Sequence, residues 1–155
     1  MITRRFALAA LLSLAASCSM AQPATAPAPA AQTQPLDIVT AKGVVHFNVE
    51  VVDNDATRER GLMYRTSLAP KAGMLFDFKE SREVAFWMKN TFIPLDMLFI
   101  DEHGVIQNIA RQATPHDETP IPSAGPVLGV LEINGGAADA LGIHAGDQVR
   151  EAIFH

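Results

Sequence analysis

Residues 86–101, FWMKNTFIPLDMLFID, combine the apolar content of a buried strand with three polar residues, Lys89, Asn90 and Asp96. Large aliphatic and aromatic side chains at this density predict a strand in the interior of a sheet, over residues 94–100. A charged group inside such a sheet is costly unless it is paired or hydrogen-bonded. The stretch therefore predicts a β-rich core and, within it, polar groups that need a structural or a chemical reason.

Asp96 is the residue of this stretch for which burial is most strongly indicated. In a strand that begins at Pro94, side chains alternate between faces, so Asp96 shares a face with Leu98 and Ile100. A buried carboxylate needs a cation or several N–H donors, and Lys89, across the turn KNTFIP, is the nearest cation. We expect a buried structural pair of Lys89 and Asp96. Contact of Asp96 with a ligand and acid/base catalysis are the alternatives.

Further polar and aromatic residues in apolar surroundings complete the candidate site. Glu132 lies between two aliphatic residues, and by alternation it can face water at no cost, so its burial is less strongly indicated than that of Asp96. Trp87 fits a barrel core, but at a barrel mouth its ring would stack on a sugar or another flat ligand. The candidate ligand-binding residues are Arg60, Trp87, Lys89, Asn90, Asp96 and Glu132, and no catalytic residue is assigned.

The rest of the chain has the pattern of short strands separated by polar turns. Residues 44–52, VVHFNVEVV, alternate apolar and polar side chains, which places His46 on a solvent face. Strands are predicted at 44–52, 73–78, 84–88, 94–100, 105–111, 127–133 and 148–154, and short helices at 56–64, with Asp55 as N-cap and Gly61 allowing close packing, and at 135–141. This order predicts an α+β fold: a compact, mostly antiparallel, β-barrel-like domain with two short helices.

The N-terminal segments predict export. Residues 1–21 have a cationic start, an apolar run too short to span a bilayer and a small-residue cleavage point, as is typical of a secretory signal peptide. Residues 22–35 are rich in Pro and Ala and predict a disordered tether, and residues 36–155 form one globular β-rich domain. We therefore expect a periplasmic or secreted protein. Small residues precede Cys18, so lipidation there, with anchoring to the cell envelope, is the alternative to simple release.

Charge and motifs exclude several classes of function. Removal of residues 1–21 takes away two arginines and no acid, so 12 basic residues become 10 against 17 acidic ones, a net charge of −7. An acidic domain without basic clusters argues against nucleic acid and anionic lipid as partners. The chain has no phosphate-binding loop, no nucleophile elbow and no zinc-protease helix motif. Its methionines are scattered and lack clustered His or Cys, so we expect no metal and no cofactor.

Five short segments follow one another along the chain: RGLMYR (60–65), GMLF (73–76), WMKNTFIPLD (87–96), VLE (130–132) and GIHAGD (142–147). Together these segments resemble the domain of unknown function 192 family, a set of small exported or membrane-associated prokaryotic proteins. The resemblance implies a compact β-rich fold and no established activity. Some relatives carry cysteines in the Pro-rich loop, whereas this chain has TPHDETPIP there, so no role of that thiol pair transfers to it.

The leading hypothesis is a binding or accessory module of the cell envelope. Its site would be bounded by Arg60, Trp87, Lys89, Asp96 and the Pro-rich loop 112–126, a kind of loop that either covers a site or is a plain surface excursion. Mixed charges beside an aromatic ring suit a small polar ligand, such as a sugar or a peptide terminus, or an envelope protein. The alternatives are a small enzyme that uses Asp96 and Lys89 as an acid/base pair, and a structural subunit of an envelope complex.

Overall fold

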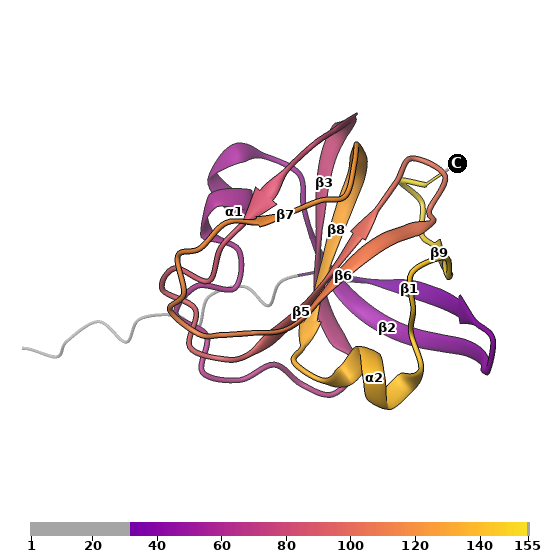
Figure 1. Ribbon diagram of the computed structural model, residues 1–155, viewed down its shortest axis with the longest axis horizontal. Coiled ribbons are helices and arrows are strands. Elements are labelled where there is room, and N and C mark those ends of the chain that lie inside the picture. The colour runs from indigo at the N-terminus through magenta and orange to yellow at the C-terminus, as the bar shows by residue number, and fades with distance from the viewer. Residues whose placement is uncertain (1–31, 155) are drawn as a thin grey trace, which may run out of the picture. The chain divides into compact units, whose positions relative to one another are not determined.

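The computed structural model describes residues 32–154, so the predicted signal peptide, Cys18 and most of the predicted tether lie outside the described residues. The described chain folds into a seven-stranded sheet, a two-stranded sheet and two short helices (Figure 1). In chain order the elements are β1 (Thr33–Thr40), β2 (Gly43–Val52), α1 (Asp55–Arg60), β3 (Ala72–Arg82), β4 (Ala85–Phe86), β5 (Leu95–Ile100), β6 (Ile106–Ala113), β7 (Ile121–Pro122), β8 (Val127–Asn134), α2 (Ala137–Leu141) and β9 (Gln148–Arg150).

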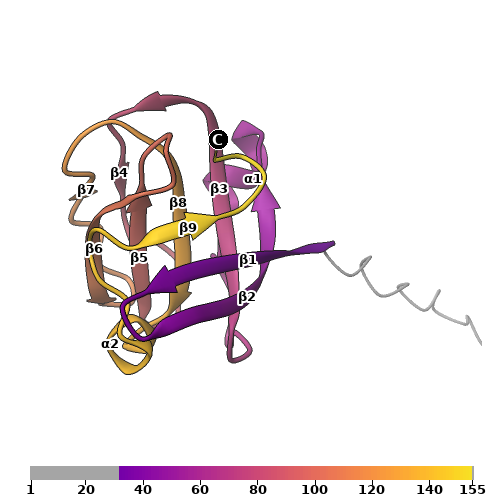
Figure 2. The same ribbon diagram turned by 90° about the vertical axis from the view of Figure 1, so that its right-hand side faces the viewer.

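The large sheet has the strand order β6-β5-β8-β3-β2-β1-β9 and curls into a half-barrel. All of its neighbouring pairs are antiparallel except β2 and β3, which are joined through α1 and run parallel. Figure 2 shows β9 between β1 and β6. Val105 and Gln148 form an isolated bridge there, which links the two edges of the sheet at one end. The predicted α+β, mostly antiparallel, barrel-like domain with two short helices is confirmed.

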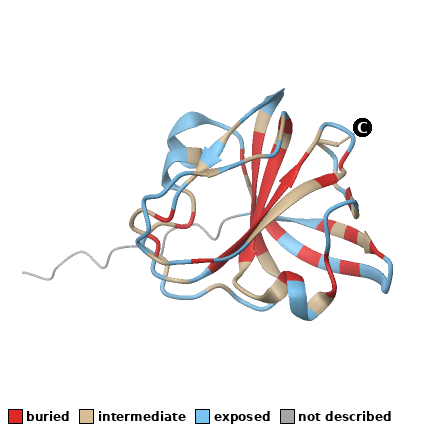
Figure 3. Ribbon diagram, viewed as in Figure 1, coloured by how far each residue is buried: buried red, intermediate tan, exposed pale blue. Residues whose placement is uncertain are grey.

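Both faces of the sheet are covered in its middle, and β5 is consequently buried at every position. Leu98 and Ile100 pack on one face, in a cluster with residues of β1, β2 and α2. Met97 and Phe99 pack on the other face, in a cluster that includes Leu62, which follows α1. The buried residues concentrate in these central strands (Figure 3). A strand buried on both faces needs apolar residues throughout, which explains the nearly unbroken apolar sequence of β5.

β2 lies nearer the edge of the sheet and shows the expected alternation. Val45, Phe47 and Val49 are buried, whereas the side chain of His46 is 76% exposed. Its Nδ1 lies 2.7 Å from Oδ1 of Asp37 on β1. The placement of His46 on the solvent face is confirmed.

The first helix differs from its prediction at the N-terminus. It was expected at 56–64 with Asp55 as its cap, but Asn54 is the N-cap, and its Oδ1 accepts a hydrogen bond from the N–H of Thr57 at 3.1 Å. Asp55 is already helical, and its carboxylate instead accepts a hydrogen bond from Arg58 at 2.6 Å. Asn and Asp are almost equally good caps, so the adjacent pair left the starting residue ambiguous.

The helix also ends earlier than predicted, because the backbone of Gly61 adopts a φ of 45° that stops it after Arg60. A β-carbon at Gly61 would lie 3.1 Å from Cζ of Phe76 on β3. The expected close packing on Gly61 is therefore observed, and its partner is an aromatic ring.

β1 and β7 were not predicted as strands, and two predicted strands are shorter than expected. β1 begins at Thr33, opposite Glu50 of β2, so the last residues of the predicted tether belong to the sheet. The strand predicted at 84–88 shortens to the two residues of β4, because its partner β7 is equally short. The strand predicted at 148–154 ends at Arg150, beyond which the chain turns and the N–H of Phe154 donates to the carbonyl of Glu151 at 3.1 Å.

Candidate functional site

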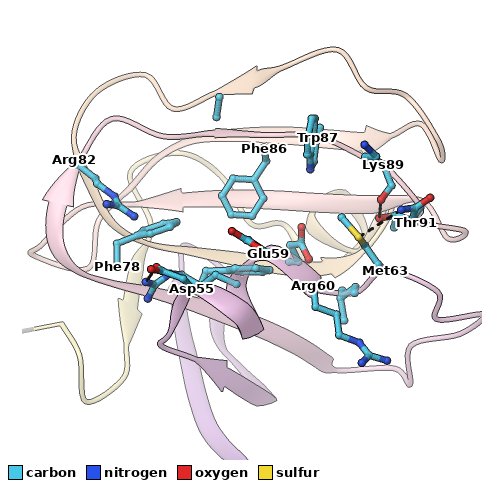
Figure 4. Close-up of a pocket in the computed structure, with 17 residues that line it drawn as sticks. Asp55, Glu59, Arg60, Met63, Phe78, Arg82, Phe86, Trp87, Lys89 and Thr91 are labelled. Atoms are coloured by element: carbon cyan, nitrogen blue, oxygen red, sulfur yellow. Dashed lines mark hydrogen bonds and ion pairs between the residues drawn. The ribbon is translucent and has the colours of Figure 1, made fainter.

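A groove of about 650 Å³ opens between α1 and the segment that carries β4 (Figure 4). α1 and the residues after it supply one wall, and β3, β4 and the residues after β4 supply the other. Five of the six candidate residues line this groove: Arg60, Trp87, Lys89, Asn90 and Glu132. The sixth, Asp96, does not.

Aromatic rings form the wall opposite α1. The ring of Phe86 lies edge-on to Phe76, with centroids 5.0 Å apart, and to Phe78, with centroids 6.3 Å apart. Trp87 follows Phe86 and is 49% exposed, so it lies at the groove and not in the core. The expected place in the barrel core is therefore wrong for Trp87, which lies at a lateral groove.

Two cations mark the ends of this aromatic wall (Figure 4). The guanidinium of Arg82 lies 5.0 Å from the centre of the Phe78 ring at one end. Nζ of Lys89 lies 5.2 Å from the centre of the Trp87 ring at the other. Arg58 of α1 also lies over the Phe78 ring, 5.9 Å from its centre. Cation–π contacts of this kind are attractive, so the rings of Phe78 and Trp87 already contact cations of the protein.

The cations of α1 differ in how they are used. Arg58 donates to the carbonyl of Asp77 at 2.7 Å and to the carboxylate of Asp55 at 2.6 Å, which fixes its side chain. Arg60 is exposed at the groove, and its guanidinium forms no hydrogen bond or ion pair with any residue of 32–154. Arg60 is therefore an exposed cation at the groove.

Glu132 is the least expected feature of the groove. It lies in β8 opposite Met74 of β3 and Met97 of β5, and only 5% of its surface is exposed. The alternation of β8 allowed this residue to face water, but the face that it shares with Val130 is covered by the cluster around Phe76 and Phe99. The sequence indicated burial less strongly for Glu132 than for Asp96, and the structure buries both, with 0% of Asp96 and 5% of Glu132 exposed.

The carboxyl of Glu132 has no partner among the described residues: it accepts no hydrogen bond and forms no ion pair within 32–154. Burial alone raises the pKa of Glu132 from its ordinary 4.5 to about 8. A cation within about 4–6 Å would lower the pKa of a carboxyl. The charged residues around the groove thus leave Glu132 uncompensated, and it is mostly protonated at neutral pH.

Asp96 is fully buried, as predicted, but Lys89 is not its partner. Its carboxylate accepts hydrogen bonds from the backbone N–H groups of Gln112 at 2.7 Å, Gly136 at 2.9 Å and Ala138 at 2.8 Å. It thereby joins β5 to the end of β6 and to the N-terminus of α2. The predicted ion pair is wrong because three backbone donors satisfy the carboxylate, whereas Lys89 lies over the Trp87 ring.

The position of Asp96 also separates it from the other candidates. It lies opposite Ile133 of β8, on the face that carries Leu98 and Ile100, whereas Glu132 points to the other face. An acid/base pair of Asp96 and Lys89 is therefore not formed. Asp96 has a structural role.

The Pro-rich loop 112–126 does not line the groove, but it supports the aromatic wall. β7 within the loop pairs with β4, and the N–H of Met88 donates to the carbonyl of Asp117 at 2.8 Å. The hydroxyl of Ser123 accepts a hydrogen bond from the N–H of Val84 at 3.1 Å. The loop thus fixes the segment that presents Phe86 and Trp87.

Several groove residues were not identified from the sequence, above all Glu59, Arg82 and the rings of Phe78 and Phe86. The phenylalanines have the pattern of core strand residues, and Glu59 and Arg82 have that of solvated surface. The positive φ of Gly61 and the break in pattern between β3 and β4 were the local signs that the chain bends around this place.

The described residues show neither a metal-binding cluster nor a membrane-spanning helix. Among residues 32–154, no group of three or more His, Cys, Asp or Glu side chains is arranged to hold a metal ion. No helix of these residues is long and apolar enough to cross a membrane.

The fold and the groove place this protein among small β-rich domains built on a half-barrel sheet. The chain belongs to the DUF192 family, described as an uncharacterized ACR, whose model matches residues 37–151. The resemblance to the domain of unknown function 192 family is therefore confirmed. Among the curated proteins, none matches the chain.

Two solved structures are similar to this chain. One, from Sinorhizobium meliloti 1021, is provisionally described as a transcription regulator; it is 46% identical, with a TM-score of 0.76, over 78% of this chain and 95% of that chain. The other, from Novosphingobium aromaticivorans DSM 12444, is a protein of unknown function; it is 43% identical, with a TM-score of 0.78, over 85% of this chain and 94% of that chain. The similarity supports the fold and assigns no activity.

Proposed function

We propose that this domain is a binding module that takes a small polar ligand into the groove between α1 and β4. The observation that carries the proposal is the carboxyl of Glu132, which is buried at the groove without a partner among residues 32–154. No fully buried side-chain oxygen or nitrogen of residues 32–154 lacks a hydrogen-bond partner, so the carboxyl oxygens of Glu132 reach the groove, where a polar group of a ligand can meet them. Aromatic rings beside it offer flat apolar contact for the rest of such a ligand.

The residues that line the groove with Glu132 favour binding over catalysis. A nucleophile and a base within hydrogen-bonding reach would be expected of a hydrolase, and the groove lining contains no Ser, Cys or His. The enzyme that was considered with Asp96 and Lys89 as its acid/base pair loses its basis, because Asp96 is committed to backbone donors. A structural subunit of an envelope complex is the remaining alternative, and stable co-purification with one partner at fixed stoichiometry would favour it.

We also propose that the domain acts outside the cytoplasm, in the periplasm or after secretion, with lipid anchoring at Cys18 as the alternative to release. The motivation is the signal-like sequence of residues 1–21 followed by a Pro- and Ala-rich stretch. Cell fractionation and the mass of the mature N-terminus would test it. Recovery of the intact chain in the cytoplasm would contradict export.

The description of the Sinorhizobium meliloti protein as a transcription regulator is not extended to this chain. The formal net charge is −5 over the whole sequence, and DNA binding relies on clustered Lys and Arg that neutralise phosphates. A gel-shift assay at low salt tests this, and tight DNA binding would contradict the expectation that the domain does not bind DNA.

The binding proposal is tested by thermal shift against envelope sugars, peptides and small amines. Trp87→Ala is the matched variant, because its half-exposed ring can be removed with little effect on the fold. We expect at least one class of compound to raise the melting temperature of the wild type, and to do so less for Trp87→Ala. Absence of a shift with every class would overturn the proposal.

A further inference from the structure

We propose that the ligand of this groove is a small organic molecule that carries a protonated amine, which Glu132 receives as a carboxylate, with Glu59 as a second anion in the lining of the same groove. This inference rests on the proposed binding function and narrows it to one chemical class. The inference is based on where the positively and negatively charged side chains lie along the groove.

The two ends of the aromatic wall already hold cations of the protein, and its middle does not. Arg82 lies over Phe78 at one end and Lys89 over Trp87 at the other, whereas Phe86 and Glu59 lie between them (Figure 4). These two contacts demonstrate that rings of this wall accept positive charge.

The lining of the groove combines the two elements that recognise an ammonium group. Glu132 supplies a buried carboxyl that no described residue satisfies, and Phe76 and Phe86 supply ring surfaces in the same lining. Glu59 is exposed on α1 and likewise forms no hydrogen bond or ion pair within 32–154. Carboxylates beside aromatic rings suit an organic cation, whereas a hard metal ion would require several oxygen ligands.

The neighbouring cations of the protein do not pair with Glu132. Arg58 is held by Asp55 and the carbonyl of Asp77. Burial is the cause of the raised pKa of Glu132, with no opposing contribution from a nearby positive charge. The charged groups that face the groove are Asp55, Arg58, Glu59, Arg60, Arg82 and Lys89, and the strands on either side of β8 place uncharged Met74 and Met97 opposite Glu132.

Binding of an amine then has a distinct dependence on pH. Glu132 must lose its proton to pair with an ammonium, so binding near pH 7 releases a proton and tightens, by up to about tenfold per pH unit, until Glu132 is ionised in the free protein. A neutral ligand that accepts a hydrogen bond from protonated Glu132 would show the opposite trend, with affinity lost above about pH 8.

Three probes of similar shape separate the possibilities: 2-phenylethylamine, 2-phenylethanol and 3-phenylpropanoate, titrated into the purified protein by NMR or calorimetry. We expect the amine to bind at least tenfold more tightly than the alcohol, and the carboxylate to bind most weakly. Calorimetry of the amine in two buffers with different ionisation enthalpies should reveal proton release. Equal or tighter binding of the alcohol or the carboxylate, or no measurable binding of the amine, would overturn the inference.

Variants localise the effect. Glu132→Gln should reduce amine affinity at least tenfold and abolish proton release, and Glu59→Gln, at an exposed position that does not threaten folding, should reduce affinity severalfold and leave proton release intact. Unchanged amine binding in Glu132→Gln would contradict the inference. If the thermal-shift screen finds a ligand without an amine, the inference fails and the binding function stands; if it finds none, both fail.

Discussion

Replacing Glu132 by Gln should stabilise this protein at alkaline pH and leave its stability nearly unchanged near pH 5. The folded pKa of Glu132 is raised to about 8 from its ordinary 4.5. Between these values the folded state holds a proton that the unfolded state has lost, so the free energy of unfolding falls as pH rises. Above the folded pKa the effect is complete. Gln has the shape of the protonated acid and cannot ionise, so the variant lacks this loss.

The magnitude follows from the two pKa values. They differ by about 3.5, and each pKa unit corresponds to about 1.4 kcal/mol, so full ionisation of Glu132 costs about 5 kcal/mol. Of this, about 3.5 kcal/mol should be lost between pH 5 and pH 8, because part of the cost is already present at pH 5 and part appears only above pH 8. Water that enters the groove would solvate the carboxylate, so these figures are upper bounds.

The assay is urea denaturation followed by far-UV circular dichroism at several pH values from 5 to 9. The quantity of interest is the difference in unfolding free energy between Glu132→Gln and the wild type, because other titrating groups cancel in it. Glu83→Gln, at an exposed position of the same chain, is the control and should give a constant difference near zero. A difference for Glu132→Gln that does not grow from pH 5 to pH 8 would refute the buried, uncompensated state of Glu132.

The remaining predictions concern neighbouring groups. Asp96→Ala should lower the unfolding free energy by about 3–5 kcal/mol in urea titrations, because three buried N–H groups lose their acceptor; a loss below 1 kcal/mol would contradict its structural role. Lys89→Ala should cost less than about 1 kcal/mol in the same titration, since its ammonium only lies over the Trp87 ring. Gly61→Ala should lower the melting temperature by an amount equivalent to about 1–3 kcal/mol, because its φ is positive and Phe76 is 3.1 Å from the added carbon; unchanged melting would be unexpected. Trp87→Ala should lower the unfolding free energy by about 1–2 kcal/mol in the same titration, because about half of its large side chain is covered.

The parts of the fold that were predicted correctly are those with a local signal. The unbroken apolar sequence of β5 indicated a buried strand, and the alternation of β2 indicated a half-exposed one. β1 was missed because its first residues, Thr33 to Pro35, continue a Pro-rich composition, and only pairing with β2 makes them a strand. The parallel pairing of β2 and β3 likewise depends on the path through α1, which leaves no mark in either strand.

Most of the candidate residues were identified from the sequence, but their contacts and burial were not. Arg60, Trp87 and Asn90 stood out as polar or aromatic residues in apolar surroundings, and they do line one groove. The partners of Asp96 could not be predicted, because backbone N–H groups carry no sequence signature and come from positions 16 to 42 residues away. The burial of Glu132 depends on which face of β8 is covered, and α1 and β4, distant in sequence, decide that.

Asp96 and Glu132 are both buried carboxyl groups, but they have opposite effects on the stability of this domain. Both carboxyls are buried in adjacent strands, on opposite faces of one sheet. The fold supplies Asp96 with three donors, and a buried carboxylate so satisfied stabilises the elements that it joins. Within residues 32–154 it supplies Glu132 with none, although methionines occupy both opposite positions and an apolar residue there would pack at no electrostatic cost. Stability therefore accounts for Asp96 and opposes Glu132, and a destabilising group that opens on a cavity is the arrangement expected where a protein has to bind another molecule.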